Sequence, residues 1–146
     1  MLPDGSSDLP IYVLDSCALL AFLGGEDGGK EVKLVLRRAS RRKCRLLMSV
    51  VSLGEVAYIT ERERGLARVH EVLARIRELP VNVIDVNRST ALEAAHLKAN
   101  YPLAYADCFV AALARAGGAT VVTGVPEFGQ LETDSEVAVS WLLRHV

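Results

Sequence analysis

Short apolar segments alternate with longer segments of helical periodicity along this chain of 146 residues. The apolar segments predict strands at residues 11–14, 45–48, 81–86, 120–123 and 137–141. The segments between them predict helices at residues 18–23, 29–42, 66–79 and 104–116, with two more helices capped by Ser49 or Ser52 and by Asn87 or Ser89. Because parallel strands need long crossover connections, this alternation predicts an α/β fold with a mostly parallel five-stranded sheet flanked by helices.

The chain is expected to form one domain. Its length suits a single hydrophobic core, and no linker or repeat divides it. Residues 1–10 contain Pro, Gly and Ser and are expected to be a flexible N-terminal lead-in. Residues 11–146 are expected to make up the domain.

Charge is unevenly distributed, although the formal net charge is only -1. That net charge by itself favours neither a nucleic-acid nor a membrane partner. Basic residues nevertheless concentrate between Lys30 and Arg45, where Glu31 is the single acid. This basic segment is either a solvated helix face or a surface that contacts RNA phosphates.

The cysteines and the hydropathy pattern favour a cytoplasmic protein. Cys17, Cys44 and Cys108 are scattered and form no C-x-x-C motif, which is typical of reduced thiols. The N-terminal residues lack the basic and apolar regions of a signal peptide. No apolar run approaches the ~20 residues that span a bilayer.

Three carboxylates stand in apolar surroundings. Asp15 ends the first predicted strand, while Glu55 and Asp107 lie inside apolar stretches expected to be helical. Burying an acid without a partner is costly, so three such acids suggest one shared partner. Ligands of parallel sheets bind beyond the carboxyl ends of the strands, where these acids could meet. A divalent cation is the simplest partner, because hard cations prefer oxygen ligands. We also expect the helix N-terminus near Asp107 to help keep that acid ionised.

Four segments resemble, in order and spacing, the motifs of the PIN domain family: VLDSCALL at 13–20, SLGEV at 52–56, YADCFVAALA at 105–114 and VVTG at 121–124. Within that family the chain looks most like the VapC-type toxin ribonucleases of toxin–antitoxin pairs. The resemblance implies a PIN-like parallel sheet, Mg²⁺ or Mn²⁺ as cofactor and endonucleolytic cleavage of RNA. It also implies a homodimer and a cognate antitoxin protein as partners.

The resemblance assigns roles to individual residues. Asp15, Glu55 and Asp107 match the family's first three acids and would be catalytic and metal-binding, while Thr123 would act behind them on a carboxylate or a water. The family's fourth acid usually follows that Thr in a Thr-Gly-Asp sequence. Here Val125 stands in its place, and valine cannot bind a metal.

Two acids further along the chain are candidates to replace the missing one. Glu127 lies two residues beyond Val125, and Asp134 lies farther on. Cys17 is a milder departure, since Ser or Asn is common at that position of the family. Because Mg²⁺ needs only one or two protein carboxylates besides waters and phosphate, three acids could still hold an ion.

The first hypothesis is therefore a metal-dependent endoribonuclease, the toxin of a toxin–antitoxin pair. The alternative is a catalytically weak PIN-like module that binds RNA or protein, because Val125 replaces the fourth acid. A receiver-like signalling domain is disfavoured, since the residues before Asp15 are apolar and no lysine follows Lys98.

Overall fold

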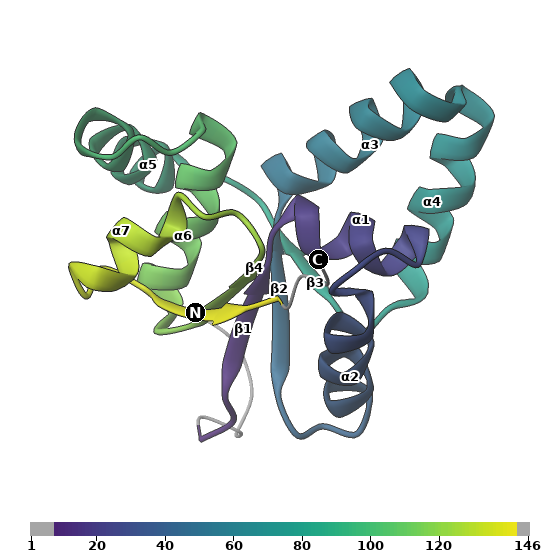
Figure 1. Ribbon diagram of the computed structural model, residues 1–146, viewed down its shortest axis with the longest axis horizontal. Helices are drawn as coiled ribbons and strands as arrows, with labels where there is room; N and C mark the ends of the chain where they lie inside the picture. Colours follow the sequence, from purple (N-terminus) through teal and green to yellow (C-terminus); the bar gives the residue numbers. More distant parts are fainter. Residues whose placement is uncertain (1–7, 143–146) are drawn as a thin grey trace.

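The computed structural model describes residues 8–142, which form a parallel sheet between two groups of helices (Figure 1). The sheet has five strands in the order β3-β2-β1-β4-β5, and each neighbouring pair is parallel. The strands are β1 (Ile11–Leu14), β2 (Arg45–Ser49), β3 (Asn82–Ile84), β4 (Thr120–Thr123) and β5 (Ala138–Trp141). The predicted α/β fold with a five-stranded sheet is confirmed, and the third strand is shorter than expected.

The helices follow the predicted pattern with one addition. They are α1 (Ser16–Gly24), α2 (Gly29–Ser40), α3 (Val50–Arg64), α4 (Leu66–Glu78), α5 (Arg88–Asn100), α6 (Tyr105–Gly117) and α7 (Phe128–Thr133). The short helix α7 was not predicted. Its six residues are too few to be stable alone, and the buried side chains of Phe128 and Leu131 hold it against the rest of the protein.

Side chains cap three of these helices at their N-termini. Asp15 accepts a hydrogen bond from the Ala18 N–H at the start of α1. Ser49 caps α3 and Asn87 caps α5 in the same way, which decides between the two cap residues predicted for each helix. Asp15 directly follows β1, Ser49 is the last residue of β2 and Asn87 lies shortly after β3, so the chain turns into a helix at the carboxyl edge of the sheet.

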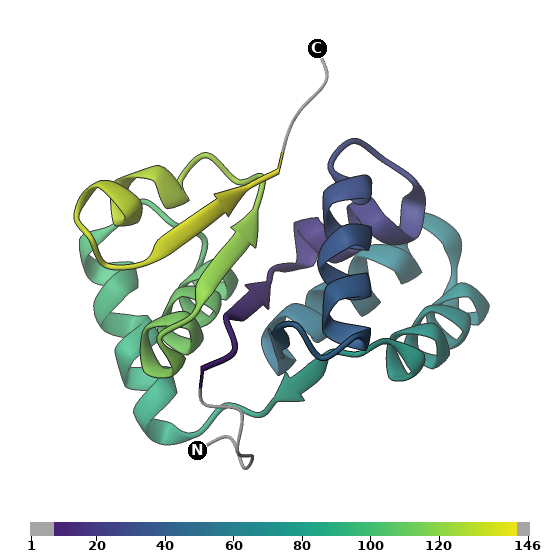
Figure 2. The same ribbon diagram turned by 90° about the horizontal axis from the view of Figure 1, so that it is seen from below.

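Alternate residues of the central strands face opposite sides of the sheet. Val13 of β1 packs with α5, α6 and α7, whereas the next residue, Leu14, packs with α1 and α2. Leu47 and Leu46 of β2 divide in the same manner. Figures 1 and 2 show α5–α7 on one side of the sheet and α1–α4 on the other. Burial on both faces explains why these strands read as continuous apolar runs.

Helices α1 and α2 approach each other closely at Gly29. A Cβ atom at this position would lie 2.7 Å from the carbonyl oxygen of Ala21. That distance is well inside van der Waals contact, so only glycine fits here without a shift of backbone. The glycine at the start of α2 therefore sets how the two helices pack.

Of the predicted lead-in, residues 1–7 lie outside the described residues, as do residues 143–146 at the other end of the predicted domain. Among the helices of residues 8–142, none combines the length and apolar character needed to cross a membrane.

Candidate active site

The four residues singled out in the sequence come from separate elements at the carboxyl edge of the sheet. Asp15 directly follows β1, and Thr123 is the last residue of the neighbouring strand β4. Glu55 lies in α3, which follows β2, and Asp107 lies in the first turn of α6. Helix α3 packs against both α1 and α6 (Figure 1). The fold thus brings these parts of the chain together where ligands of parallel sheets bind.

Asp15 is fully buried and has partners on both carboxylate oxygens. Its Oδ1 accepts the Ala18 N–H at 2.7 Å, and its Oδ2 accepts the Thr123 hydroxyl. Burial raises the pKa of Asp15 to about 6, against the lowering effect of these hydrogen bonds, and the nearby charge of Glu55 raises it further. Asp15 is therefore an acid held in one orientation, whose ionised form lacks a compensating charge.

Thr123 links Asp15 to the segment that follows β4. While its hydroxyl donates to Asp15, the same oxygen accepts the backbone N–H of Val125 at 2.9 Å. The side chain of Thr123 is completely buried. Thr123 therefore holds the carboxylate of Asp15 and the backbone after β4 through one hydroxyl group.

Glu55 is oriented by a residue that the sequence analysis missed. The hydroxyl of Ser16 donates to Oε1 of Glu55 at 2.9 Å, across 39 positions of sequence. Ser16 is almost fully buried and follows Asp15 directly. That adjacency was the only signal in the sequence, since nothing in a serine at a helix start indicates a distant carboxylate.

Asp107 is the most perturbed acid of the group. Burial raises its pKa to about 7, and the charges of Asp15, Glu55 and Glu127 add to the effect. Burial and three like charges therefore disfavour the ionised form of Asp107, although it lies in the first turn of α6, where a helix dipole favours negative charge. Four acids therefore act on one another at this edge of the sheet.

The donor atoms suit a divalent cation, although no cage is preformed. Within residues 8–142, no group of three or more His, Cys, Asp or Glu side chains stands close enough to hold a metal ion as the side chains lie. The nearby groups are nevertheless carboxylates, and oxygen ligands are those that Mg²⁺ and Mn²⁺ prefer. A divalent cation would offset the repulsion that raises the pKa of Asp15 and of Asp107. The residues therefore fit such an ion in charge and in chemistry.

The basic segment lies elsewhere. Arg45 opens β2 beside Ile11, the first residue of β1, so the arginine-rich end of α2 is at the amino edge of the sheet. Asp15 is at the opposite, carboxyl edge. The arginine-rich end of α2 and the acidic residues therefore lie at opposite edges of the sheet. Lys33 and Arg37 instead line a separate cavity of about 700 Å³ formed with the α1–α2 loop and the end of α4.

Comparison with protein families gives one match that covers most of the chain. Residues 12–131 match the family model of the PIN domain. The chain belongs to the PIN domain family. Comparison with curated protein sequences found no match.

Solved structures with the same fold include members of VapBC toxin–antitoxin systems. A chain of VapBC2 from Rickettsia felis, bound to a DNA fragment from the promoter, superposes with a TM-score of 0.70 at 17% identity, covering 91% of this chain and 99% of that chain. VapC20 from Mycobacterium tuberculosis, a toxin that cleaves the sarcin-ricin loop, has a TM-score of 0.64 at 18% identity over 82% of this chain and 93% of its own. A chain of VapBC-1 from nontypeable Haemophilus influenzae has a TM-score of 0.65 at 21% identity, covering 90% and 97%. At these identities the likeness establishes the shared fold.

Proposed function

We propose that this protein is a metal-dependent endoribonuclease of the VapC type, the toxin of a toxin–antitoxin pair. The observation that carries the proposal is the grouping of Asp15, Glu55 and Asp107, from three separate elements, at the carboxyl edge of the sheet. Family membership supports it, because the match to the PIN domain model spans residues 12–131 and so includes all three acids. Structural neighbours from VapBC systems support the toxin assignment.

In this proposal Asp15, Glu55 and Asp107 hold Mg²⁺ or Mn²⁺. Such an ion lowers the pKa of water and offsets the negative charge of a phosphodiester during hydrolysis. The protein's own contribution is orientation. Thr123 fixes the carboxylate of Asp15, and Ser16 fixes that of Glu55. Hydrogen bonds of this kind, one step behind a ligand, are usually needed for full metal affinity.

The proposed partners are an RNA substrate, a cognate antitoxin protein and a second copy of the chain. The antitoxin is supported by the neighbours that were solved as VapBC complexes. The homodimer and a cytoplasmic location are proposed because they follow from the VapC assignment. Evidence against that assignment would also remove the basis for both.

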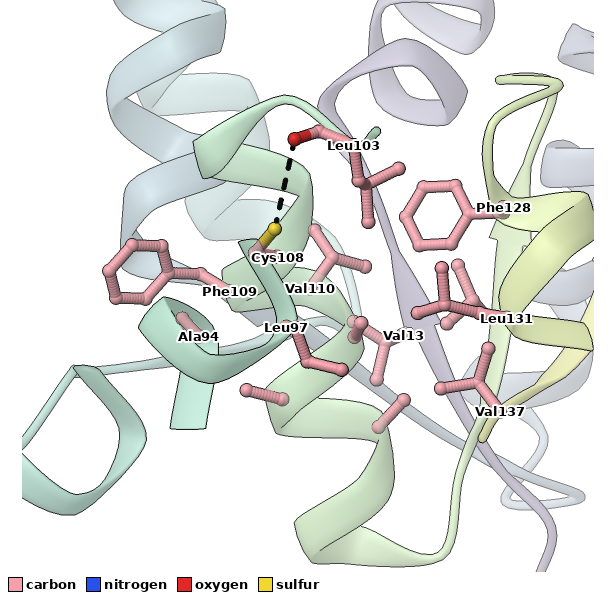
Figure 3. Packing of buried hydrophobic residues seen from close by; sticks show 14 of the residues in the cluster. Val13, Ala94, Leu97, Leu103, Cys108, Phe109, Val110, Phe128, Leu131 and Val137 are labelled. Carbon is pink, nitrogen blue, oxygen red and sulfur yellow. Dashed lines mark hydrogen bonds between the residues drawn. The ribbon is translucent and has the colours of Figure 1, made fainter. Parts of the chain in front are cut away.

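A second candidate is a PIN-like module that binds RNA or protein with little turnover. It is favoured by Val125, whose side chain packs against the buried cluster around α5–α7 (Figure 3) and offers no ligand. An RNA-binding module would retain affinity for RNA without cleaving it. The two candidates therefore differ in a single measurable property.

Cleavage of RNA after metal removal and return distinguishes them. The purified chain is stripped with EDTA and incubated with total RNA, and with an RNA that contains the sarcin-ricin loop, with and without Mn²⁺. We expect cleavage only with Mn²⁺, and a loss of at least about 100-fold in Asp15→Asn. Glu132→Gln removes an acid from the exposed face of α7 and serves as the matched control. Cleavage that survives both EDTA and Asp15→Asn would refute metal-dependent cleavage at this site, and RNA binding without cleavage would favour the module.

A further inference from the structure

We propose that the basic turn between α2 and β2 is a second RNA-binding surface, which holds an RNA at a distance from the acidic site. The basic turn carries its cations within a short stretch of sequence, at Arg37, Arg38, Arg41, Arg42 and Lys43. The inference rests on the proposed function for the choice of RNA as ligand. It concerns side chains that take no part in holding the proposed ion.

The cations of the basic turn are available to a ligand. All five side chains are exposed. In the part of the chain that the structure describes, none of them forms an ion pair with an acid. The acid of α2, Glu31, lies in the first turn of the helix, at the opposite end from the basic turn. The positive charge is therefore concentrated and faces solvent.

Hydrogen bonds hold the basic turn in one conformation. The Arg41 N–H donates to the carbonyls of Arg37 and Arg38, each at 3.2 Å. The Lys43 N–H donates to the Arg38 carbonyl at 2.9 Å, and the Ser40 hydroxyl donates to the Arg37 carbonyl at 2.8 Å. Cations on a backbone that is already ordered lose less conformational entropy on binding than cations on a mobile loop.

The helix dipole explains only part of this charge. Cations in the last turn of a helix are stabilised by the dipole, which accounts for Arg37 and Arg38. Arg42 and Lys43 lie beyond the C-cap residue, Arg41. The φ angle of Arg42 is 58°, in the left-handed region that glycine adopts at less cost than arginine. Neither the helix nor the turn therefore requires a cation at these two positions.

Phosphate is the anion that these side chains fit best. All but one are arginines, whose planar guanidinium groups can donate two parallel hydrogen bonds to a phosphate. The guanidinium of Arg38 lies over the ring of Tyr12, 5.9 Å from its centroid, which holds it beside β1. Ala39 and Ser40, which separate the cations, offer no large apolar side chain to anchor a protein or a membrane. Clustered cations without such anchors are typical of binding to a nucleic-acid backbone.

The basic turn and the acidic site lie at opposite edges of the sheet. Arg45, two residues beyond the turn, pairs with Ile11 at the start of β1, whereas Asp15 follows the end of that strand. Figure 1 shows the connection from α2 to β2 below the sheet and the start of α3 above it. At roughly 3.3 Å per strand residue, these edges are about 13 Å apart. One phosphodiester group cannot reach both surfaces, so each would contact a different part of the same RNA.

Binding of poly(U) RNA in EDTA tests the inference without cleavage. Fluorescently labelled RNA is titrated with the native chain and with the double variant Arg41→Glu/Lys43→Glu, and anisotropy is measured between about 50 and 200 mM salt. We expect the double variant to bind at least about tenfold more weakly. The slope of log affinity against log salt should fall by about 1.4, because each phosphate contact on a single strand contributes about 0.7.

A second double variant controls for overall charge. Arg64→Glu/Arg68→Glu reverses the same number of charges at the junction of α3 and α4. It should bind poly(U) within about threefold of the native chain, because charges beyond a Debye length are largely screened. Mn²⁺ binding by Arg41→Glu/Lys43→Glu should equal that of the native chain, which also shows that this variant is folded and that its acidic site is intact.

Three results would overturn the inference: no binding of poly(U) by the native chain, equal binding by the two double variants, or displacement of the RNA by polyglutamate as effectively as by unlabelled poly(U). The last result would indicate an acidic protein as the ligand. Failure to bind Mn²⁺ or to cleave RNA would count against the proposed function alone, since binding at the basic turn is measured in EDTA and needs neither.

Discussion

Replacing Asp15 by asparagine is expected to stabilise the protein at pH 8 when no divalent ion is present. The carboxyl of Asp15 has a pKa of about 6 in the folded protein, against an ordinary value of 3.8. Between these values the folded protein binds more protons than the unfolded chain. The contribution of Asp15 to stability is therefore full below pH 3.8 and is lost as the pH rises through 6.

The size of the effect follows from the shift and from the hydrogen bonds. A shift of about two pKa units corresponds to about 3 kcal/mol of stability lost at pH 8. Asparagine avoids this loss and can still cap α1, because its single oxygen can accept the Ala18 N–H. That oxygen cannot also serve the Thr123 hydroxyl, which costs about 1 kcal/mol. The expected net gain at pH 8 is about 2 kcal/mol.

Urea denaturation in EDTA, followed by circular dichroism, measures this difference. Asp15→Asn should exceed the native chain in free energy of unfolding at pH 8 and show no gain at pH 4. Glu132→Gln, which removes an exposed acid, should stay within about 0.5 kcal/mol of the native chain at both pH values. An Asp15→Asn variant that is less stable than the native chain at pH 8 would refute the reasoning.

Four further predictions concern the site and the packing of the helices. Ser16→Ala should weaken Mn²⁺ binding, measured by calorimetry, about tenfold, because Glu55 loses its hydrogen-bond donor. Ser16→Thr keeps a hydroxyl and should bind Mn²⁺ more tightly than Ser16→Ala. Equal affinities of the two variants would contradict this prediction. Gly29→Ala should lower the free energy of unfolding by about 1–3 kcal/mol, since its Cβ meets the carbonyl of Ala21. Gly54 lies within α3, and a Cβ at this position would meet open space. In the same urea experiment Gly54→Ala should therefore raise the free energy of unfolding by about 0.5–1 kcal/mol. A lower free energy of unfolding in this variant would contradict the reasoning. Mn²⁺ at 100 times its dissociation constant should add about 3 kcal/mol of stability, so an unchanged melting temperature would count against ion binding.

Most of the fold could be predicted because its central strands are buried on both faces. Val13 and Leu14 face opposite sides of the sheet, yet both must be apolar, which gives the uniform runs that mark parallel strands. Cap residues such as Ser49 and Asn87 then indicate where the following helices begin. These signals are local, and so the sequence alone is sufficient to detect them.

The features that escaped prediction depend on contacts between distant segments. Helix α7 is held by the burial of Phe128 rather than by its own propensity. The bond from Ser16 to Glu55 and the high pKa of Asp107 arise only when separate elements pack together. The position of the arginines at the amino edge likewise depends on how α2 returns to β2, beginning at Arg45.

The central position of β1 ties assembly of the acidic site to completion of the chain. Its neighbour β2 follows early in synthesis, but its other neighbour, β4, is made late. A nascent polypeptide that has emerged only as far as α5 carries Asp15 and Glu55 but not Asp107 or Thr123. Pairing of β1 with β4 joins opposite ends of the sequence and is expected to come late in folding. If the chain is a ribonuclease as proposed, a nascent chain would not cleave the RNA of its own ribosome until β4 and β5 had emerged and paired with the rest of the sheet.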